Sequence, residues 1–166
     1  MASGKSSVAE ALALRLKKSV HLRGDLFRKM IVSGRKDMSE NPTPEALYQL
    51  DMRHSLTAKA AIEYYNNGFT VVVQDNFLGQ RLAYFSALLD PHPTYVVVLN
   101  PTVQTIEERE HSRRKKGYIG FTVNKLHKKF LEETPKIGLW LDTSDMSIEQ
   151  TINEIEKRVP TEGLIR

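Results

Sequence analysis

The sequence predicts an α/β protein in which a parallel sheet lies between layers of helices. Short apolar runs rich in β-branched residues alternate with longer segments that have helical spacing. This alternation is typical of a right-handed α/β sheet with helices on both faces. Four polar residues close or follow the expected strands: Asp25, Asp75, Asn100 and Asp142. Ligands of such sheets bind at the carboxyl ends of the strands, so these residues mark the expected site.

The spacing of apolar residues and the position of a glycine predict the elements of the first 41 residues. A helix is expected over 6–18, since Val8, Leu12 and Leu16 recur at i, i+4 spacing. A short strand over 19–22 follows it. A helix over 26–33, which Gly34 ends, and a polar loop over 35–41 come next.

The middle of the chain has clear start and stop residues. Thr43 reads as an N-cap with Pro44 at the first helical position, and the long helix should run to about Asn67 with Gly68 closing it. The run over 69–74 is nearly continuous and apolar, as expected of a strand buried on both faces.

The second half alternates in the same way. Helices are expected over 79–89, 102–116 and 123–133, with strands over 94–99 and 138–142. Ser147 and Gln150 have the spacing of a capping box, which predicts a final helix that ends near Val159.

Composition restricts the class of protein. The chain has 166 residues, which suits a single domain over 1–166, and 40% of them are hydrophobic and 27% charged. It has no cysteine, which removes disulfides, thiolate metal sites and Cys nucleophiles. The net charge of +4 suits an anionic ligand but is mild for a nucleic-acid binder. No segment resembles a signal peptide or a membrane span, so we expect a cytoplasmic protein.

The stretch Ala2-Ser3-Gly4-Lys5-Ser6-Ser7 contains the second half of a phosphate-binding loop, G-x-x-x-x-G-K-[ST]. The unpaired N–H groups at a helix start bind phosphate, and Gly4 lets the backbone approach it closely. Lys5 can bridge the β- and γ-phosphates, and the Ser6 hydroxyl can ligate Mg²⁺. The alternative is a chance G-K-S before an ordinary helix, which the α/β pattern downstream disfavours.

Two aspartates follow strands that should face this loop. Asp25 can accept the proton of a substrate hydroxyl that attacks the γ-phosphate, although it is also a good N-cap for the next helix. Asp75 ends Val71-Val-Val-Gln-Asp75, an apolar strand followed by an acid, which is the Walker B form that holds Mg²⁺. A turn role before Asn76 is the alternative for Asp75.

A charged helix precedes a segment bounded by Gly117 and Gly120, so we expect a lid near 109–122. Arg109 and Arg113 lie four residues apart on one helix face and can offset charge on the transferring phosphoryl group. A solvated face, or a nucleic-acid patch over 113–116, is the alternative. Thr143 and Ser144 follow the last strand, where a loop can border the nucleotide base or simply form a turn.

These motifs, in this order along nearly the whole chain, resemble the P-loop small-molecule kinases. The chloramphenicol phosphotransferase-like branch is the most similar, with zeta-toxin, shikimate-kinase and gluconate-kinase types as relatives. The motifs are Ala2–Ser7, Arg23-Gly-Asp25, Val73-Gln-Asp75, Arg109-Glu-x-x-Arg113 and Leu141-Asp-Thr-Ser144.

The resemblance implies phosphorylation of a small-molecule hydroxyl with ATP and Mg²⁺. It implies that Lys5 and Ser6 bind phosphates and Mg²⁺ and that Asp25 is the base. The lid arginines would be Arg109 and Arg113, and Thr143-Ser144 would border the adenine. The acceptor pocket would be formed by 28–41 and 76–81, where four residues are candidates: Arg28, Arg35, Asn76 and Arg81.

The sequence departs from the pattern of this family at its N-terminal end. The first, central strand and the first glycine of the loop would precede Met1. Two strands would then lack one ladder partner, which is costly for buried N–H and C=O groups. We therefore expect weak or absent transfer and reduced stability, with a late start codon favoured over a trimmed or degraded chain. Two other functions stay open: a nucleotide-binding module without transfer, and a polynucleotide-end kinase.

Overall fold

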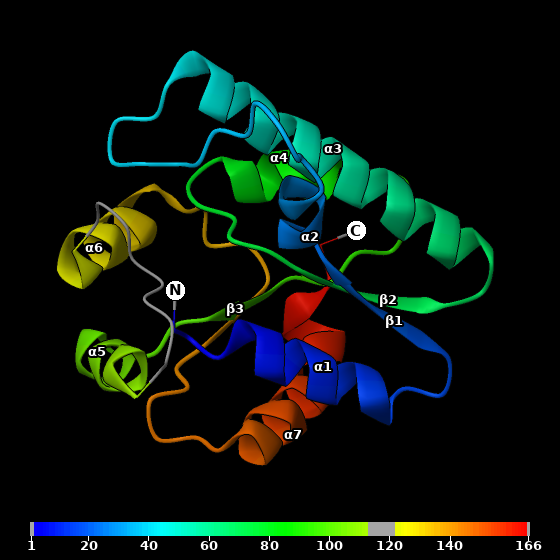
Figure 1. Ribbon diagram of the computed structural model, residues 1–166. Coiled ribbons are helices and arrows are strands. Elements are labelled where there is room, and N and C mark those ends of the chain that lie inside the picture. The colour runs from blue at the N-terminus through cyan, green and yellow to red at the C-terminus, as the bar shows by residue number, and fades with distance from the viewer. Residues whose placement is uncertain (1, 113–121, 166) are drawn as a thin grey trace.

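The computed structural model describes residues 2–112 and 122–165, and its elements alternate between helix and strand as the sequence predicts (Figure 1). In chain order they are α1 (Lys5–Arg15), β1 (Ser19–Arg23), α2 (Asp25–Lys29), α3 (Pro44–Asn66), β2 (Thr70–Gln74), α4 (Arg81–Ala87), β3 (Val97–Leu99), α5 (Val103–His111), α6 (Val123–Glu133), β4 (Leu139–Leu141), α7 (Ile148–Arg158) and η1 (Val159–Gly163), a π-helical turn.

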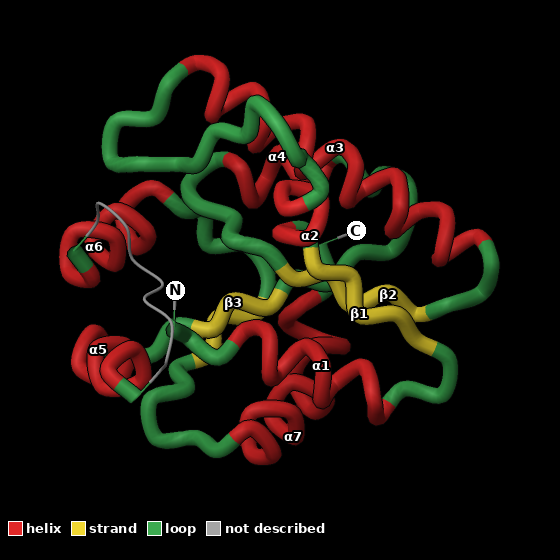
Figure 2. The backbone as a smooth tube through the Cα atoms, in the orientation of Figure 1, coloured by secondary structure: helices red, strands yellow, loops and turns green. Residues whose placement is uncertain are grey.

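The strands pair in parallel, which confirms the predicted fold class. β1 pairs with β2, from Ser19 opposite Thr70 to Arg23 opposite Gln74. β3 pairs with β4, from Val97 opposite Leu139 onward. Among the described residues these are two separate two-stranded sheets, so β2 and β3 each have one strand neighbour (Figure 2).

The expected burial of the 69–74 strand on both faces is wrong. In β2, Thr70 is exposed and Val71–Gln74 are only half-buried. The apolar run is what a central strand needs, but β2 is hydrogen-bonded to β1 alone and its other edge has no strand beside it in the described structure. The apolar run therefore predicted the strand itself correctly, but it did not predict how deeply the strand is buried.

Helices cover the strands from two sides. α3 and α4 lie on one side, and α1 and α7 lie together on the other (Figure 1). One core cluster joins α1 and α7 to β4 through Val8, Leu141, Ile152 and Ile155. A second is built from Leu82, Val96 and Val98, with Phe77 and Trp140 among the side chains packed against it. Both clusters pack against the β3–β4 pair.

The predicted caps are confirmed. The Thr43 hydroxyl accepts from the Ala46 N–H with Pro44 at the first helical position, and α3 ends at Asn66 with Gly68 at φ 78°. Ser147 and Gln150 form the complete capping box of α7. Each cap satisfies helix N–H groups that would otherwise have no partner.

Two predicted helices extend too far at their C-terminal ends. α1 ends at Arg15 instead of near residue 18, because the Ser19 hydroxyl donates to the Ala13 carbonyl at 2.6 Å as the chain turns into β1. α2 ends at Lys29 instead of 33, and the Gln49 side chain of α3 binds the Gly34 carbonyl and the Lys36 N–H. These bonds draw the segment after α2 onto α3.

β3 is also shorter than expected. Residues before β3 pair with the C-terminal end instead: Val96 N–H donates to the Gly163 carbonyl at 2.8 Å, and Tyr95 bridges Leu164 in antiparallel fashion. α5 is described to His111, so the rest of the predicted 102–116 helix and most of the expected lid lie outside the described residues. Within the described ranges, no helix is both long and apolar enough to cross a membrane.

Candidate functional site

The phosphate-binding half-loop forms the start of α1. Gly4 is its N-cap, in the left-handed region at φ 86°, a conformation that glycine adopts at little cost. Its carbonyl accepts from the Val8 N–H at 3.0 Å, while the N–H groups of the first turn point out of the helix end. Lys5 Nζ lies 3.2 Å from the hydroxyl of Ser3, which is buried. This geometry can hold an anionic group.

Ser6 ties this helix start to the end of β2. Its hydroxyl donates to Gln74 Oε1 at 3.0 Å, across 68 positions of sequence. A hydroxyl has one proton and two lone pairs, so donation to Gln74 leaves the lone pairs of Ser6 for a cation. Gln74 directly precedes Asp75, so this bond holds the start of α1 at the end of β2 after which Asp75 follows.

Asp75 is buried at that edge. Its Oδ1 accepts from Arg53 Nη2 at 2.7 Å and from the backbone N–H of Asn76 at 2.7 Å. Its Oδ2 is buried and has no hydrogen-bond partner within the described part of the chain. Burial raises the pKa of Asp75, and the nearby Arg53 opposes the rise. A buried carboxylate oxygen without a partner is suited to a metal ion or its water.

Gly24 makes room for this carboxylate. A Cβ added at Gly24 would lie 2.1 Å from Asp75 Oδ2 and 3.0 Å from the Thr57 hydroxyl. Its backbone is ordinary right-handed helix, so the need for glycine here is steric. The Arg23-Gly-Asp25 motif therefore needs its glycine because two neighbouring strand ends approach closely.

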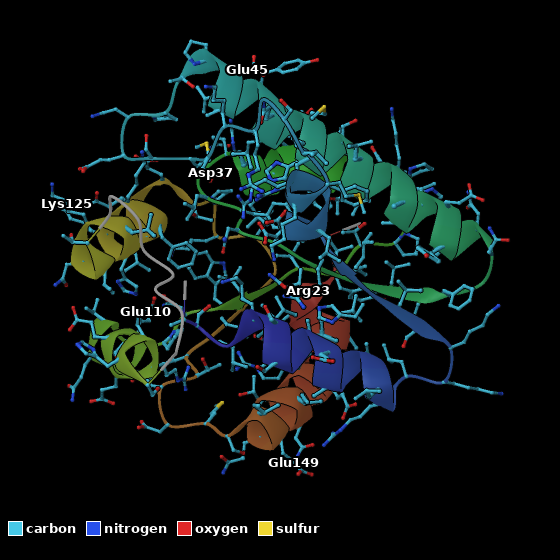
Figure 3. The ribbon with its side chains drawn as sticks, in the orientation of Figure 1. Arg23, Asp37, Glu45, Glu110, Lys125 and Glu149 are labelled. Atoms are coloured by element: carbon cyan, nitrogen blue, oxygen red, sulfur yellow. The ribbon has the colours of Figure 1, made fainter. Side chains whose placement is uncertain are left out.

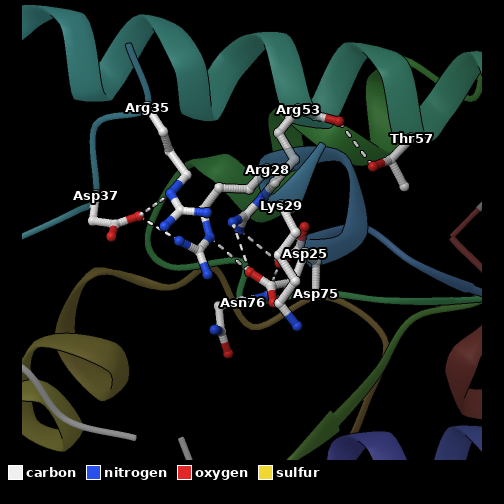
Figure 4. A network of polar contacts seen from close by, with 9 residues as sticks. All are labelled: Asp25, Arg28, Lys29, Arg35, Asp37, Arg53, Thr57, Asp75 and Asn76. Carbon is white, nitrogen blue, oxygen red and sulfur yellow. Dashed lines mark hydrogen bonds and ion pairs between the residues drawn. The ribbon is translucent and has the colours of Figure 1, made fainter. Parts of the chain in front are cut away.

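Asp25 begins α2 and lies within a network of cations (Figure 4). It accepts from Arg28 Nε at 2.9 Å and lies 3.0 Å from Lys29 Nζ and 3.8 Å from Arg53 Nη1. Partial burial would raise the pKa of Asp25, but the hydrogen bonds from Arg28 and Lys29 outweigh it and the net shift is downward. The carboxylate is therefore ionised at neutral pH and able to accept a proton.

The predicted acceptor-side residues divide between two places. Arg28 binds Asp37 as well as Asp25, Arg35 lies 3.8 Å from Asp37, and Asn76 follows Asp75, all within the network of Figure 4. Arg81 instead pairs with Asp51 of α3 at 3.1 Å.

A cavity of about 370 Å³ lies beside the start of α1. Its wall includes four of the seven expected nucleotide residues, Ser3, Gly4, Ser7 and Thr143, and the predicted lid residue Arg109, but not Lys5, Ser6 or Ser144. Arg109 Nη2 donates to the Thr143 carbonyl at 2.8 Å, and Thr143 is buried with an unpartnered hydroxyl. Ser144 donates to Asp142 Oδ1 at 2.6 Å, which braces the turn. Arg113, the second predicted lid arginine, lies outside the described residues.

α6 contacts the loop that precedes α3 through an ion pair. Lys125 of α6 pairs with Glu40 of the loop before α3 at 3.2 Å, and Figure 3 shows Lys125 and Asp37 on this side of the molecule. This ion pair between exposed side chains contributes little to stability, but it places α6 next to the loop that carries the acceptor-side candidates.

Sequence reasoning missed Arg53, Gln74 and the steric role of Gly24. Arg53 had a detectable pattern, because it falls on the buried stripe of α3 with its neighbours at helical spacing: Leu50, His54, Thr57, Ala58 and Ala61. An arginine on such a stripe needs a buried acid as partner. Gln74 gave no comparable pattern, since glutamine is common near strand ends.

The residues present fit the two groups that the motifs imply. Ser6 and Asp75 supply oxygen ligands, and Mg²⁺ needs only one or two protein ligands beside phosphate and water. The described residues hold no cluster of three or more His, Asp or Glu side chains suited to a metal. The large cavity at the α1 start, with the buried Thr143 hydroxyl in its wall, has room for a nucleotide base.

An α/β domain with a phosphate loop at a helix start, facing acids at parallel strand ends, is a P-loop kinase-like domain. A family model, AAA_33, described as an AAA domain, matches residues 1–131, so the chain belongs to this family.

Solved structures agree on the fold. The chain is similar to the APS kinase of Mycobacterium tuberculosis, solved with AMPPNP and APS, at 21% identity and a TM-score of 0.67, over 94% of this chain and 90% of that one. It is also similar to a tunicamycin resistance protein of Deinococcus radiodurans, at 18% identity and a TM-score of 0.62, over 98% and 91%. No curated protein sequence matches the chain significantly.

Proposed function

We propose that the chain is an ATP- and Mg²⁺-dependent kinase that transfers the γ-phosphoryl group to a hydroxyl of a small molecule. The observation that carries the proposal is the meeting of three elements at one sheet edge. The start of α1 is bonded through Ser6 to Gln74, Gln74 precedes Asp75, and Asp75 shares Arg53 with Asp25. The similarity in fold to an APS kinase that was solved with AMPPNP supports it.

The nucleotide would lie along the start of α1. Gly4 and the first-turn N–H groups bind the phosphates, and Lys5 offsets their charge. The base and ribose would occupy the 370 Å³ cavity, with Thr143 offering its unpartnered hydroxyl and Arg109 its guanidinium. Ser6 and Asp75 would hold Mg²⁺, which neutralises charge on the phosphates when bound.

Asp25 would act on the acceptor. Its carboxylate accepts the proton of the attacking hydroxyl, whose oxygen forms the new bond to the γ-phosphorus as the bond to the β–γ bridging oxygen breaks. Arg28, Lys29 and Arg53 orient the carboxylate. Most of the rate enhancement would come from positioning and charge stabilisation. By this proposal the protein functions in the cytoplasm without nucleic acid or membrane as substrate.

Asp25→Asn tests the proposal. The variant should lower transfer of label from γ-labelled ATP to a panel of hydroxylated metabolites by roughly 10²–10⁴-fold, the usual worth of a general base. The stabilisation that Mg²⁺-ATP gives to the melt should stay unchanged. Glu10→Gln, the same change at an exposed carboxylate of α1, is the matched control and should keep full transfer.

Three outcomes would contradict it. Equal transfer by Asp25→Asn and by the unchanged chain would show that Asp25 is not the general base. Nucleotide binding with no transfer to any acceptor, by either chain, would favour a nucleotide-binding module. Steeply salt-dependent binding of polynucleotides would instead favour a polynucleotide-end kinase.

A further inference from the structure

Two strand edges have no partner strand in the described part of the chain. β2 pairs only with β1 and β3 only with β4, so each of them has one open edge. Thr70 and Gln74 make their backbone hydrogen bonds on the β1 side of β2. Because successive residues of a strand alternate between its two edges, Val71 and Val73 present their N–H and C=O groups to the open edge.

The open edge of β3 is defined in the same way. The Val96 carbonyl and the Asn100 N–H make hydrogen bonds to β4 at 2.9 and 2.8 Å. Val97 and Leu99 therefore present their backbone groups to the opposite edge. Both residues are half-buried, as are the valines of β2, and no described residue satisfies the open-edge N–H and C=O groups. Backbone groups shielded from water are rarely left unpaired, so each edge lacks a strand.

The two open edges lie on either side of one space beneath α1. This helix packs against β2 and, through Val8, against the β3–β4 pair, with Val97 and Leu99 beside the same cluster. Its first turn is bonded through Ser6 to the end of β2 and lines a cavity with Thr143, which follows β4, so both strand pairs end on the same side (Figure 1). A helix is about 10 Å across and neighbouring strands lie about 4.8 Å apart, so two unpaired strands beneath one helix are about one strand apart.

Neither edge carries the protection that exposed sheet edges have in native proteins. Such edges hold charged residues or proline, which prevent other chains from pairing with them. β2 is Thr-Val-Val-Val-Gln and β3 is Val-Val-Leu, without charge or proline. The β2 valines also belong to neither of the two hydrophobic core clusters found among the described residues. This composition is typical of strands that have a neighbour on both sides.

The shape of the space restricts what it can bind. Helices lie on both faces of the strands, with α1 on one and α3 on the other at β2, so a further helix of about 10 Å has no room (Figure 1). One extended chain fits, and it can satisfy both edges at once.

We propose that the space between β2 and β3 binds an extended apolar segment of another polypeptide, which adds as a parallel strand. Its backbone bonds to Val71 and Val73 on one side and to Val97 and Leu99 on the other. Its side chains alternate between the two helix layers, so β-branched residues and leucine suit both. The strand site goes beyond the proposed reaction, because it uses backbone groups that phosphate transfer does not need.

A pair of labelled peptides tests this site by fluorescence anisotropy. The first, Lys-Lys-Val-Ile-Val-Leu-Val-Lys-Lys, matches the five-residue length of β2 and carries lysines for solubility. In the second, proline replaces the central valine. The first peptide should bind saturably and the proline peptide about tenfold more weakly or less tightly still, because proline lacks an N–H and does not fit a strand paired on both edges.

Two variants at one position of the chain test the β2 edge. Val71→Pro removes an open-edge N–H that makes no bond to β1, whereas Val71→Thr keeps this N–H and the β-branched shape. Val71→Pro should weaken binding of the first peptide about tenfold, and Val71→Thr should bind it like the unchanged chain. A thermal melt checks that both variants fold, and if Val71→Pro does not, the peptide pair and hydrogen exchange decide.

Hydrogen exchange then locates the bound peptide. The amides of Val71, Val73, Val97 and Leu99 should exchange more slowly when the first peptide is bound, and those of α7 should not change. Equal binding of the two peptides, equal binding by folded Val71→Pro and Val71→Thr chains, or slower exchange only outside β2 and β3 would overturn the proposal. A stable dimer with these amides protected before peptide is added would also overturn it, since a second copy of the chain would then fill the space. A chain that transfers no phosphate would refute the kinase proposal and leave the strand site in place.

Discussion

His54 should make the stability of the fold fall as the pH is lowered below about 6.5. Its side chain is fully buried on α3, with its ring 5.1 Å from that of Phe77 and 6.0 Å from that of Phe85. Neither ring nitrogen has a partner in the described structure. Burial lowers the pKa of His54 from 6.5 to about 4, and the charges of Arg53 and Arg81 add to this.

The sign and size follow from proton linkage. The unfolded chain binds a proton at His54 with a pKa near 6.5 and the folded chain only near 4, so protons favour unfolding between these values. Stability is fully present above the unfolded value and decreases as the pH falls. Between pH 7.5 and pH 5 the loss is about 2 kcal/mol, rising to about 3 kcal/mol below pH 4.

Urea unfolding of the unchanged chain and of His54→Phe, at pH 7.5 and pH 5, measures this. Phenylalanine keeps an aromatic ring beside Phe77 and Phe85 but cannot take up a proton. The unchanged chain should lose about 2 kcal/mol more than the variant, a midpoint difference of roughly 1 M urea. The pKa of His21 is also lowered by burial, but that residue is present in both chains and cancels. Equal losses in the two chains would refute the reasoning.

Three further changes test the packing and the caps. Gly24→Ala should destabilise the fold and reduce Mg²⁺-dependent nucleotide binding, since the new Cβ would lie 2.1 Å from Asp75 Oδ2; an unchanged melt and unchanged binding would contradict the steric argument. Thr43→Ala removes the N-cap bond to Ala46 and should cost about 1 kcal/mol in urea unfolding, whereas Thr43→Ser should cost little. Leu141→Ala empties part of the core between α1 and α7 and should cost about 2–5 kcal/mol; a loss below 1 kcal/mol would show that this core is loosely packed.

Local rules predicted those features that depend on neighbours in the sequence. The caps formed by Thr43 and Ser147 were predictable because each makes its hydrogen bond to a residue only three positions further along the chain. The strands were predicted because β-branched runs mark them wherever they pack. The helix start just after Gly4 was predicted because one short motif marks it, and its phosphate-binding role stays a prediction.

Tertiary contacts explain what sequence reasoning missed. Arg53 meets Asp75 across 22 positions and Ser6 meets Gln74 across 68, and no local pattern sets such pairs. Arg81 was grouped with Arg28 and Arg35 as a candidate cation of the acceptor pocket, but it pairs with Asp51 of α3 instead. The exposure of β2 depends on which strand lies beside it, which its own apolar composition does not specify.

Nucleotide binding at the start of α1 is the central claim, and the thermal melt with and without Mg²⁺-ATP tests it most directly. At a hundred times its dissociation constant, ATP should stabilise the fold by about 2.7 kcal/mol, a shift of roughly 5–10 °C for a chain of this size. Lys5→Ala should abolish the shift, and Lys17→Ala, an exposed lysine just beyond the same helix, should keep it. A shift that survives Lys5→Ala, or no shift in the unchanged chain, would contradict the assignment of this loop.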